Sequence, residues 1–326
     1  MRIQLARHLA CVKHYGRNRN LSIDVLESSN GIECSEGFLK CEECNQLYPV
    51  IAGVALLLEN VADYISSRPF LLGKWILSSK TSAMKEYLKE ISSTLTKLTS
   101  PQGHNLYEVD GSLYESYNWA QFDFDSNDRF LSLLKHKMYP NDLYNKVVHS
   151  TATNLDGAAL DMGCSSGYAA FQLAKKFAFV IGMDLSFSFI SEARRRMASL
   201  RQGNLDFVVA DCIMPPFHPN RFDLVIALNI IEFMDIEQLL DRIHRLLKDD
   251  GEVAFSSPYD YNRTLQVNKI GPQSFRQLLE KSGFRIGSKY VTSESFIPWT
   301  LRINERTYLF YYVDYLRARK ASKGKR

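Results

Sequence analysis

The feature that most constrains this chain is the stretch Ala158–Gly167, a short apolar run that ends in an acid and opens into a small-residue turn. The acid is Asp161, and a helical pattern over 168–176 follows the turn. A second apolar run then ends at Asp184. This order predicts a β-strand, a tight loop, a helix and a second strand whose terminal carboxylate can bind a ribose. We therefore interpret the stretch as a cofactor site.

Strand-like and helical patterns alternate around this loop, which predicts an α/β fold with a doubly wound, Rossmann-like parallel sheet. With 326 residues, of which 45% are hydrophobic, the chain can bury a substantial core. Ligands of such sheets bind at the carboxyl ends of the strands. The expected strands are Ala158–Met162, Phe179–Met183, Leu205–Ala210, Phe222–Leu228 and Glu252–Ser256, and the expected helices are Tyr168–Lys176, Ser188–Leu200 and Ile236–Lys248.

The loop does not fit a dinucleotide. A G-x-G-x-x-G fingerprint starting at Gly163 requires glycine where the chain has Ser165 and Tyr168. The bulky Tyr168 also disfavours close approach of a pyrophosphate. An acid at the strand end repels a diphosphate but suits a ligand that carries ammonium and sulfonium charges. S-adenosylmethionine has both charges and no phosphate.

From residue 154 to 320 the sequence resembles the class I S-adenosylmethionine-dependent methyltransferases. Leu160–Gly167 is similar to the family's "L-D-x-G-C-G-x-G" loop, with serine in the middle glycine position. In that family the loop wraps the methionine portion of the cofactor. The resemblance therefore implies a seven-stranded sheet whose last strand is antiparallel, and it assigns cofactor binding to Asp161, Gly163, Cys164, Ser165 and Gly167.

Two further acids follow the next two expected strands. Asp184, which precedes Leu185, matches the family's acid that binds both ribose hydroxyls, a geometry that suits a carboxylate. Asp211 matches the acid that accepts the adenine amino group, and the amide of Cys212 would contact the ring. A single aspartate at a strand end is usually a turn or a helix cap. Acids at three successive strand ends, beginning with the glycine loop, favour a cofactor site.

The fourth expected strand leads to the methyl acceptor. Phe222–Phe233 is similar to the family's "F-D-x-V-x-x-x-x-V-x-E-H", with Phe233 where histidine is common, so a histidine base is absent there. Asn229 faces the acceptor's place, and we expect it to contact both cofactor and acceptor. Tyr259, at the rim of the fifth strand, is a second catalytic candidate. Beyond it, 284–291 and 305–313 are expected to form an antiparallel edge pair, with Phe296–Arg302 lying over the substrate.

An aromatic, polar segment over Asn105–Phe122 precedes the cofactor domain and shows no periodicity. It is expected either to line a substrate pocket or to pack one domain against the other, and both interpretations stay open. Tyr114 and Tyr117 are its candidate site residues, and Tyr117 is the one we take as catalytic.

Near the N-terminus, Cys11 and His14 form one closely spaced pair, and Cys41 and Cys44 form another. Two such pairs, separated by the length of a β-hairpin, can place four donors tetrahedrally around a structural zinc ion. A segment this short buries little apolar surface, so a metal would supply folding free energy. Cys34 is an alternative to His14 as the fourth ligand, and a set of unrelated buried thiols is the alternative to a metal site.

After the second pair, Gln46–Leu58 resembles the zinc-ribbon family of tRNA and protein methyltransferase activators, whose members end "Y-P-I-x-x-G-I-P-x-L-L". Ala55 stands where that family usually has proline. We therefore expect four regions: a zinc-ribbon-like domain over 1–62, a helical linker or cap over 63–153, a methyltransferase domain over 154–316 and a solvated basic tail over 317–326.

The remaining features favour a small-molecule enzyme. The first residues lack a signal-peptide core, and the apolar runs are too short for a bilayer, so we expect a cytoplasmic protein with no membrane partner whose six cysteines are thiols or ligands. The net charge is only +4, and no basic, aromatic stripe lies outside the tail. We expect methyl transfer to a small-molecule N, O or S acceptor. The alternatives are an RNA or protein methyltransferase that uses the zinc ribbon for recognition, and a non-catalytic relative.

Overall fold

The structure, a computed structural model, describes residues 1–14, 17, 19–95, 107–108, 111, 113–125, 139–200, 203–261, 269–290 and 296–321. From the sequence we also predict a helix over Ser126–Lys137, and this segment lies outside the described residues.

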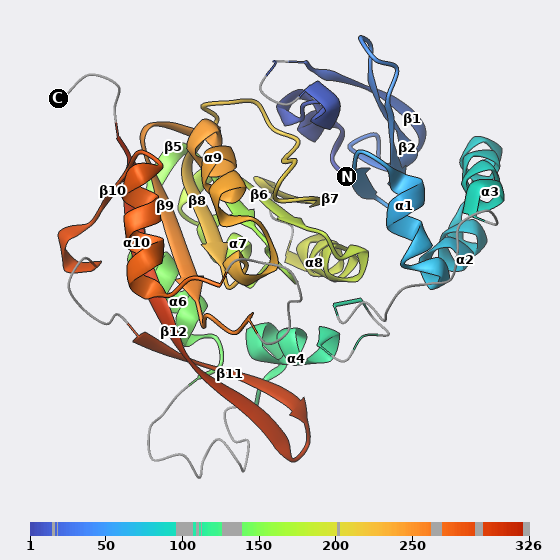
Figure 1. The fold of residues 1–326 in the computed structure, drawn as a ribbon. Helices are drawn as coiled ribbons and strands as arrows, with labels where there is room; N and C mark the ends of the chain where they lie inside the picture. The colour runs from blue at the N-terminus through green and yellow to red at the C-terminus, as the bar shows by residue number, and fades with distance from the viewer. Residues whose placement is uncertain are drawn as a thin grey trace.

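A mixed β-sheet forms the centre of the molecule (Figure 1). Part of it runs in the order β7-β6-β5-β8-β9-β12-β10, in which β5 to β9 are parallel and β12 is antiparallel to both of its neighbours. This confirms the Rossmann-like α/β fold. The strands are β5 (Asn154–Met162), β6 (Phe177–Asp184), β7 (Leu205–Ala210), β8 (Phe222–Leu228), β9 (Leu247–Ser257), β10 (Phe284–Ile286) and β12 (Thr307–Lys320).

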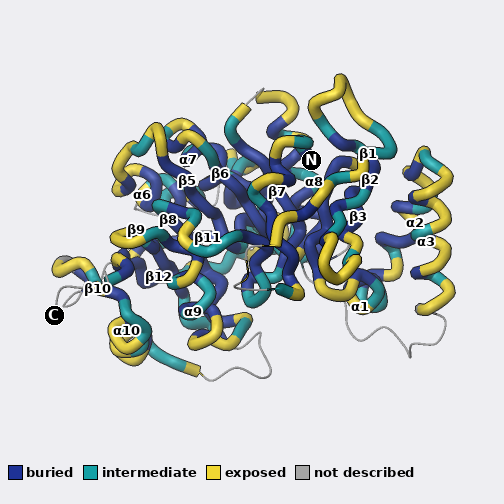
Figure 2. The backbone as a smooth tube through the Cα atoms, turned by 90° about the horizontal axis from the view of Figure 1, so that it is seen from above, coloured by how far each residue is buried: buried dark blue, intermediate teal, exposed yellow. Residues whose placement is uncertain are grey.

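Helices pack against this sheet through apolar faces. In α9 the buried residues recur at helical spacing, and the side chain of Asp235 caps the helix by accepting the N–H of Gln238 at 2.9 Å. Figure 2 shows a buried centre along the strands and exposed outer faces on the helices. The helices are α6 (Asp142–His149), α7 (Tyr168–Leu173), α8 (Phe187–Leu200), α9 (Ile236–Leu246) and α10 (Pro272–Lys281), with short 3-10 turns at Ile231–Phe233 and Ser288–Tyr290.

The N-terminal segment continues the same sheet. Its strand β4 pairs in parallel with β7, so that Ala55 lies opposite Val208, and one hydrophobic core extends across both parts. The sheet therefore has twelve strands among the described residues, because β1 to β4 and β11 (Phe296–Asn304) extend the part described above. The division at residue 62 stays a prediction. The N-terminal elements are 3-10 turns at Ile3–His8 and Val12–His14, and β1 (Leu21–Ser29), β2 (Glu33–Cys41), β3 (Leu47–Ile51) and β4 (Val54–Leu57).

Three helices lie outside these strands, at the end of the molecule far from β10 (Figure 1). They are joined to the strands by a buried acid, Glu36 of β2, whose carboxylate accepts the N–H groups of Lys80 and Thr81 at 2.6 and 2.9 Å. The carboxylate thereby satisfies backbone donors at the start of the third helix. The helices are α1 (Val61–Ser66), α2 (Pro69–Ser78) and α3 (Ser82–Leu95). Among the described residues, no helix is both long and apolar enough to cross a bilayer.

The C-terminal region differs from our expectation in two places. Phe296–Arg302, expected between the two strands of the edge pair and over the substrate, is itself part of strand β11 (Phe296–Asn304), which forms a hairpin with β12. Arg317–Lys320, expected in a basic tail, is the end of β12. Both ends of this segment are buried, and the ammonium group of Lys320 donates to the carbonyl oxygen of Leu247 at 2.7 Å. Pairing with β9 and β10 provides hydrogen-bond partners for the backbone N–H and C=O groups of these basic residues. The local sequence does not reveal this pairing.

Candidate functional site

The glycine loop makes a tight turn between β5 and α7. Gly163 and Gly167 have φ values of +75° and +89°. A Cβ atom on Gly163 would lie 2.4 Å from the Cγ2 of Ile230, and one on Gly167 would lie 2.6 Å from the ring of Phe207. Both positions therefore require glycine, because the backbone is left-handed there and because a side chain would clash with its neighbours.

Ser165, at the family's middle glycine position, also lies in the left-handed region, with φ of +50°. Its N–H donates to Oδ2 of Asp184 at 2.8 Å. Its hydroxyl is buried and has no hydrogen-bond partner among the described residues. A buried hydroxyl without a partner carries a free-energy cost that a polar ligand would remove.

The acids predicted from the sequence gather at one edge of the sheet, because β5, β6 and β7 are neighbours. Asp161 is 2% exposed and accepts the N–H of Ala170 at 3.1 Å. Burial, together with the charge of Asp184, raises the pKa of Asp161 to about 7. Asp184 accepts the N–H of Ser186 at 2.9 Å in addition to that of Ser165, and burial raises its pKa to about 6. Asp211, after β7, accepts the N–H of Ile213 at 2.8 Å.

The end of β4 completes a hollow beside two of the predicted residues. Leu185 and Asp211 line this hollow. The other lining residues are Leu57, Leu58, Glu59, Asn60, Tyr64 and Met214. Sequence reasoning missed the N-terminal contribution, because no motif marks a strand that joins the sheet beside β7. The thiols of Cys164 and Cys212 are buried, and burial raises their pKa values well above the usual range.

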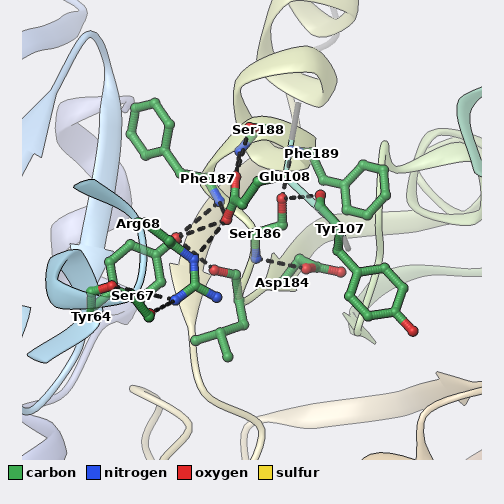
Figure 3. A network of polar contacts seen from close by, with 11 residues as sticks. Tyr64, Ser67, Arg68, Tyr107, Glu108, Asp184, Ser186, Phe187, Ser188 and Phe189 are labelled. Carbon is green, nitrogen blue, oxygen red and sulfur yellow. Dashed lines mark hydrogen bonds and ion pairs between the residues drawn. The ribbon is translucent and has the colours of Figure 1, made fainter. Parts of the chain in front are cut away.

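A buried carboxylate holds the segment around Tyr107 against the cofactor edge (Figure 3). Glu108 is 0% exposed, and its carboxylate pairs with the guanidinium of Arg68 at 3.0 Å. The hydroxyl of Tyr64 donates to the same carboxylate at 3.3 Å. Tyr64 belongs to α1 and Arg68 lies between α1 and α2, so Glu108 ties this segment to the N-terminal part of the chain.

The same carboxylate caps the helix that follows Asp184. The N–H groups of Phe187 and Ser188, at the start of α8, donate to Glu108 at 3.2 and 3.0 Å, and the hydroxyl of Ser188 donates at 2.6 Å. An anion at a helix N-terminus is stabilised by the free N–H groups and the helix dipole. Sequence reasoning did not single out Glu108, since its donors are far away in the chain. The only signal was its place in the aromatic segment.

A small cavity lies beyond the end of β8, beside Asn229. Asn229 has a φ of +55°, and its Oδ1 accepts the hydroxyl of Ser256 at 2.7 Å. Tyr117, on α4 (Tyr114–Asn118), lines the same cavity, so the structure brings together two of the three predicted catalytic residues. The other lining residues are Tyr107, Glu232, Phe233, Pro258, Asp260, Trp299, Leu301 and Tyr311.

Tyr259 is placed differently. Its neighbours Pro258 and Asp260 line the cavity, whereas its own hydroxyl donates to Asp314 at 3.0 Å. Asp314 also forms an ion pair with Arg276 at 2.7 Å. The structure therefore does not group Tyr259 with the other two candidates, and a catalytic role for it stays a prediction.

Tyr114 stacks on Phe189 with the ring centroids 5.2 Å apart. The π-helical turn Trp119–Asp123 continues α4, and Asn118 hydrogen-bonds to Ser166 of the glycine loop. The aromatic segment thus contributes Tyr117 to the cavity and Asn118 to a contact with the glycine loop. Whether it lines a substrate pocket or packs one domain against the other stays a prediction.

The predicted metal ligands also come together. One ligand atom from each of Cys11, His14, Cys41 and Cys44 lies within 4.8 Å of the others. Burial alone would raise the pKa of the Cys41 thiol, but hydrogen bonds from backbone N–H groups of the Cys41–Cys44 turn and from neighbouring thiols lower it to about 7. Cys34 lies outside the group, and its thiol donates to the carbonyl oxygen of Glu36 at 3.3 Å.

Residues 159–251 match the family model described as a methyltransferase domain. Phosphoethanolamine N-methyltransferase 1 of Arabidopsis thaliana is 31% identical over 140 residues, which is 38% of this chain and 28% of the plant protein. Ubiquinone biosynthesis O-methyltransferase of Coxiella burnetii is 25% identical over 185 residues, which is 54% of this chain and 78% of that protein. The chain thus aligns with less than a third of the plant relative's length.

Among solved structures, phosphoethanolamine N-methyltransferase 2 of Haemonchus contortus in complex with S-adenosyl-L-methionine is similar at 21% identity, with a TM-score of 0.40. The match covers 53% of this chain and 45% of that one. The likeness concerns the fold alone. The resemblance of the N-terminal segment to the activator family stays a prediction.

Proposed function

We propose that the chain, whose residues 159–251 match the model of a methyltransferase domain, is an S-adenosylmethionine-dependent methyltransferase that acts on a small molecule. The observation that carries the proposal is the arrangement of Asp161, Asp184 and Asp211 at the ends of three neighbouring strands, around a loop with two left-handed glycines.

The residues at this edge fit the cofactor. The buried hydroxyl of Ser165 needs a polar partner. Both oxygens of Asp184 already accept one backbone N–H, and each has a second lone pair for a ribose hydroxyl. Asp211 and Leu185 line the hollow at the end of β4, where the adenine ring would lie. Burial raises the pKa of both acids, and a neighbouring acid adds to the shift, so their ionised forms would be stabilised by the sulfonium and ammonium charges of the cofactor.

Bound S-adenosylmethionine would supply an activated methyl group on a sulfonium. The chain's own task is then to align the acceptor, to exclude water and to favour its deprotonated form. Asn229 and Tyr117 line the cavity nearest the end of β8 and would orient the acceptor there.

The small-molecule assignment is supported by the residues that line that cavity and by the relatives. Five of the ten lining residues are aromatic, and none of those described is arginine or lysine. The relatives' names concern phosphoethanolamine and ubiquinone biosynthesis. The alternative, an RNA or protein acceptor presented by the N-terminal segment, predicts a basic rim and a substrate that this cavity cannot enclose.

Zinc at the N-terminal cluster is a separate part of the proposal. Tetrahedral zinc with bonds of about 2.3 Å to sulfur separates two sulfur atoms by about 3.8 Å, and a sulfur from an imidazole nitrogen by about 3.5 Å. The sulfur atoms of Cys11 and Cys44 are 3.7 Å apart, and the sulfur of Cys41 lies 3.5 Å from Nδ1 of His14. The buried hydroxyl of Tyr48 lies 3.1 Å from the sulfur of Cys11, and a hydrogen bond between them would orient that ligand.

Calorimetry with S-adenosylhomocysteine tests the enzyme assignment. We expect binding by the intact chain and an affinity at least tenfold lower for Asp184→Ala, because hydrogen bonds to a charged group contribute about 1.5–3 kcal/mol each. Asp156→Ala, an exposed acid early in β5, is the matched control and should bind normally. No binding by the intact chain would refute the proposal.

A further inference from the structure

The cavity beside Asn229 contains a continuous set of aromatic rings, which we call the aromatic arc. It comprises Phe233, Tyr107, Tyr117, Trp299 and Tyr311, and successive ring centroids in this order are 5.5–5.8 Å apart. These residues come from four separate segments, so the arc is a product of tertiary structure. Aromatic faces arranged around one space attract a cation through their negative quadrupole.

Two carboxylates share the cavity with the aromatic arc. Asp260 accepts the hydroxyl of Tyr311 at 3.0 Å. Glu232 is 2% exposed, and its Oε1 accepts the N–H of Tyr259 at 3.0 Å and the hydroxyl of Ser257. The second oxygen, Oε2, is buried and has no partner among the described residues.

This carboxylate oxygen is the group that points to a ligand. A buried acceptor without a donor costs free energy, and a charged carboxylate costs more than a neutral group. Burial raises the pKa of Glu232, and the charge of Asp260 acts in the same direction. No lysine, arginine or histidine is among the residues that line the cavity in the described part of the chain.

We propose that the methyl acceptor is an amine that enters this cavity as its ammonium ion, held between the aromatic arc and the carboxylate of Glu232. This inference rests on the proposed methyltransferase function. Anionic acceptors are disfavoured here because two carboxylates and no cation line the space. A neutral acceptor could donate a hydrogen bond to Glu232 but would bring no positive charge to its buried carboxylate.

The chemistry balances for an amine. The ammonium group gives one proton to the carboxylate of Glu232, and the nitrogen regains its lone pair. That lone pair forms the new bond to the methyl carbon, while the carbon–sulfur bond breaks and its electron pair stays on sulfur. The product leaves as the methylated ammonium ion, and Glu232 is left neutral until it releases its proton to water. The pKa of Glu232 is raised by burial. A carboxylate with a raised pKa is a better general base near neutral pH than an ordinary one.

The test uses two probes of similar shape, choline, which is cationic, and 3,3-dimethylbutan-1-ol, which is neutral. Calorimetric titrations are carried out on the full chain saturated with S-adenosylhomocysteine. We expect choline to bind at least fivefold more tightly than the alcohol. Glu232→Gln and Tyr311→Leu should each reduce this preference at least threefold. Glu237→Gln, an exposed acid on α9, should leave it unchanged.

The outcomes separate the two proposals. If S-adenosylhomocysteine does not bind the intact chain, the methyltransferase proposal fails and this inference fails with it. If it binds but choline binds no better than the alcohol, or neither probe binds, only the ammonium inference is overturned. Unchanged affinity of the variants for S-adenosylhomocysteine shows that they are folded, and Tyr311→Leu keeps the test decisive should Glu232→Gln not fold.

Discussion

The most informative perturbation is Glu108→Gln, because one buried carboxylate joins three parts of the molecule (Figure 3). The substitution keeps the size of the side chain but removes the charge opposite Arg68, which is itself 7% exposed. It also replaces one accepting oxygen with an NH₂ group, which cannot accept the N–H and O–H of Ser188.

The size of the effect follows from these contacts. Removing one partner of a buried ion pair costs about 3–5 kcal/mol, since the remaining charge is left without compensation. Arg68 keeps two other acceptors, the hydroxyl of Ser67 at 2.8 Å and the carbonyl oxygen of Tyr64 at 3.3 Å, so the lower end of that range applies. We expect the free energy of unfolding to fall by about 3 kcal/mol. Because α8 begins directly after Asp184, the affinity for S-adenosylhomocysteine should fall about three- to tenfold, a cost of about 1 kcal/mol.

Denaturant unfolding and calorimetry measure the two quantities, with Glu115→Gln, an exposed acid on α4, as the matched control. The double variant Arg68→Met with Glu108→Gln removes both charges and should recover part of the lost stability. A loss below about 1 kcal/mol, with unchanged ligand affinity, would contradict the argument that this carboxylate holds the cofactor edge together.

Three further predictions concern the site. The pKa values of Asp161 and Asp184 are raised to about 7 and 6, which favours the folded chain at low pH, and this contribution is lost as the pH rises through these values. A cationic cofactor favours the ionised forms of both acids, so its binding at pH 6.5 should release protons. Calorimetry in buffers of different ionisation enthalpy measures the number of protons released. Gly163→Ala should lower stability by at least about 1–2 kcal/mol and weaken cofactor binding, because its Cβ would lie 2.4 Å from Ile230; equal melting temperatures would refute this. Metal analysis should find one zinc per chain, lost in Cys44→Ser and retained in Cys34→Ser, and a metal-free intact chain would exclude the proposed site.

Local sequence was sufficient to locate the elements around the glycine loop. The bounds predicted for β7 and β8 agree with the structure, and those of the other parallel strands agree at one end or within a few residues. Parallel strands covered on both faces are continuous apolar runs, so their sequence shows where they lie. The acids at their ends could be found for the same reason, since each follows directly on such a run.

Elements whose conformation depends on distant partners could not be found in this way. Phe296–Arg302 is not among the strands predicted from the sequence, yet it pairs with β12. Arg317–Lys320 has the composition of a tail, yet sheet pairing buries it. The spacing of the ligand pairs predicts His14 as the fourth ligand but leaves Cys34 as an alternative, and only the fold places His14 beside Cys41 and Cys34 outside the group.

By itself, then, the sequence determined the type of sheet, the glycine loop and the three strand-end acids, because each depends on residues close together in the chain. The tertiary structure decided which distant residues meet at that edge. It placed the end of β4 beside Asp211, the carboxylate of Glu108 at the start of α8, and the aromatic arc around Glu232. These contacts join residues up to hundreds of positions apart, and no local pattern of polarity encodes such a pairing.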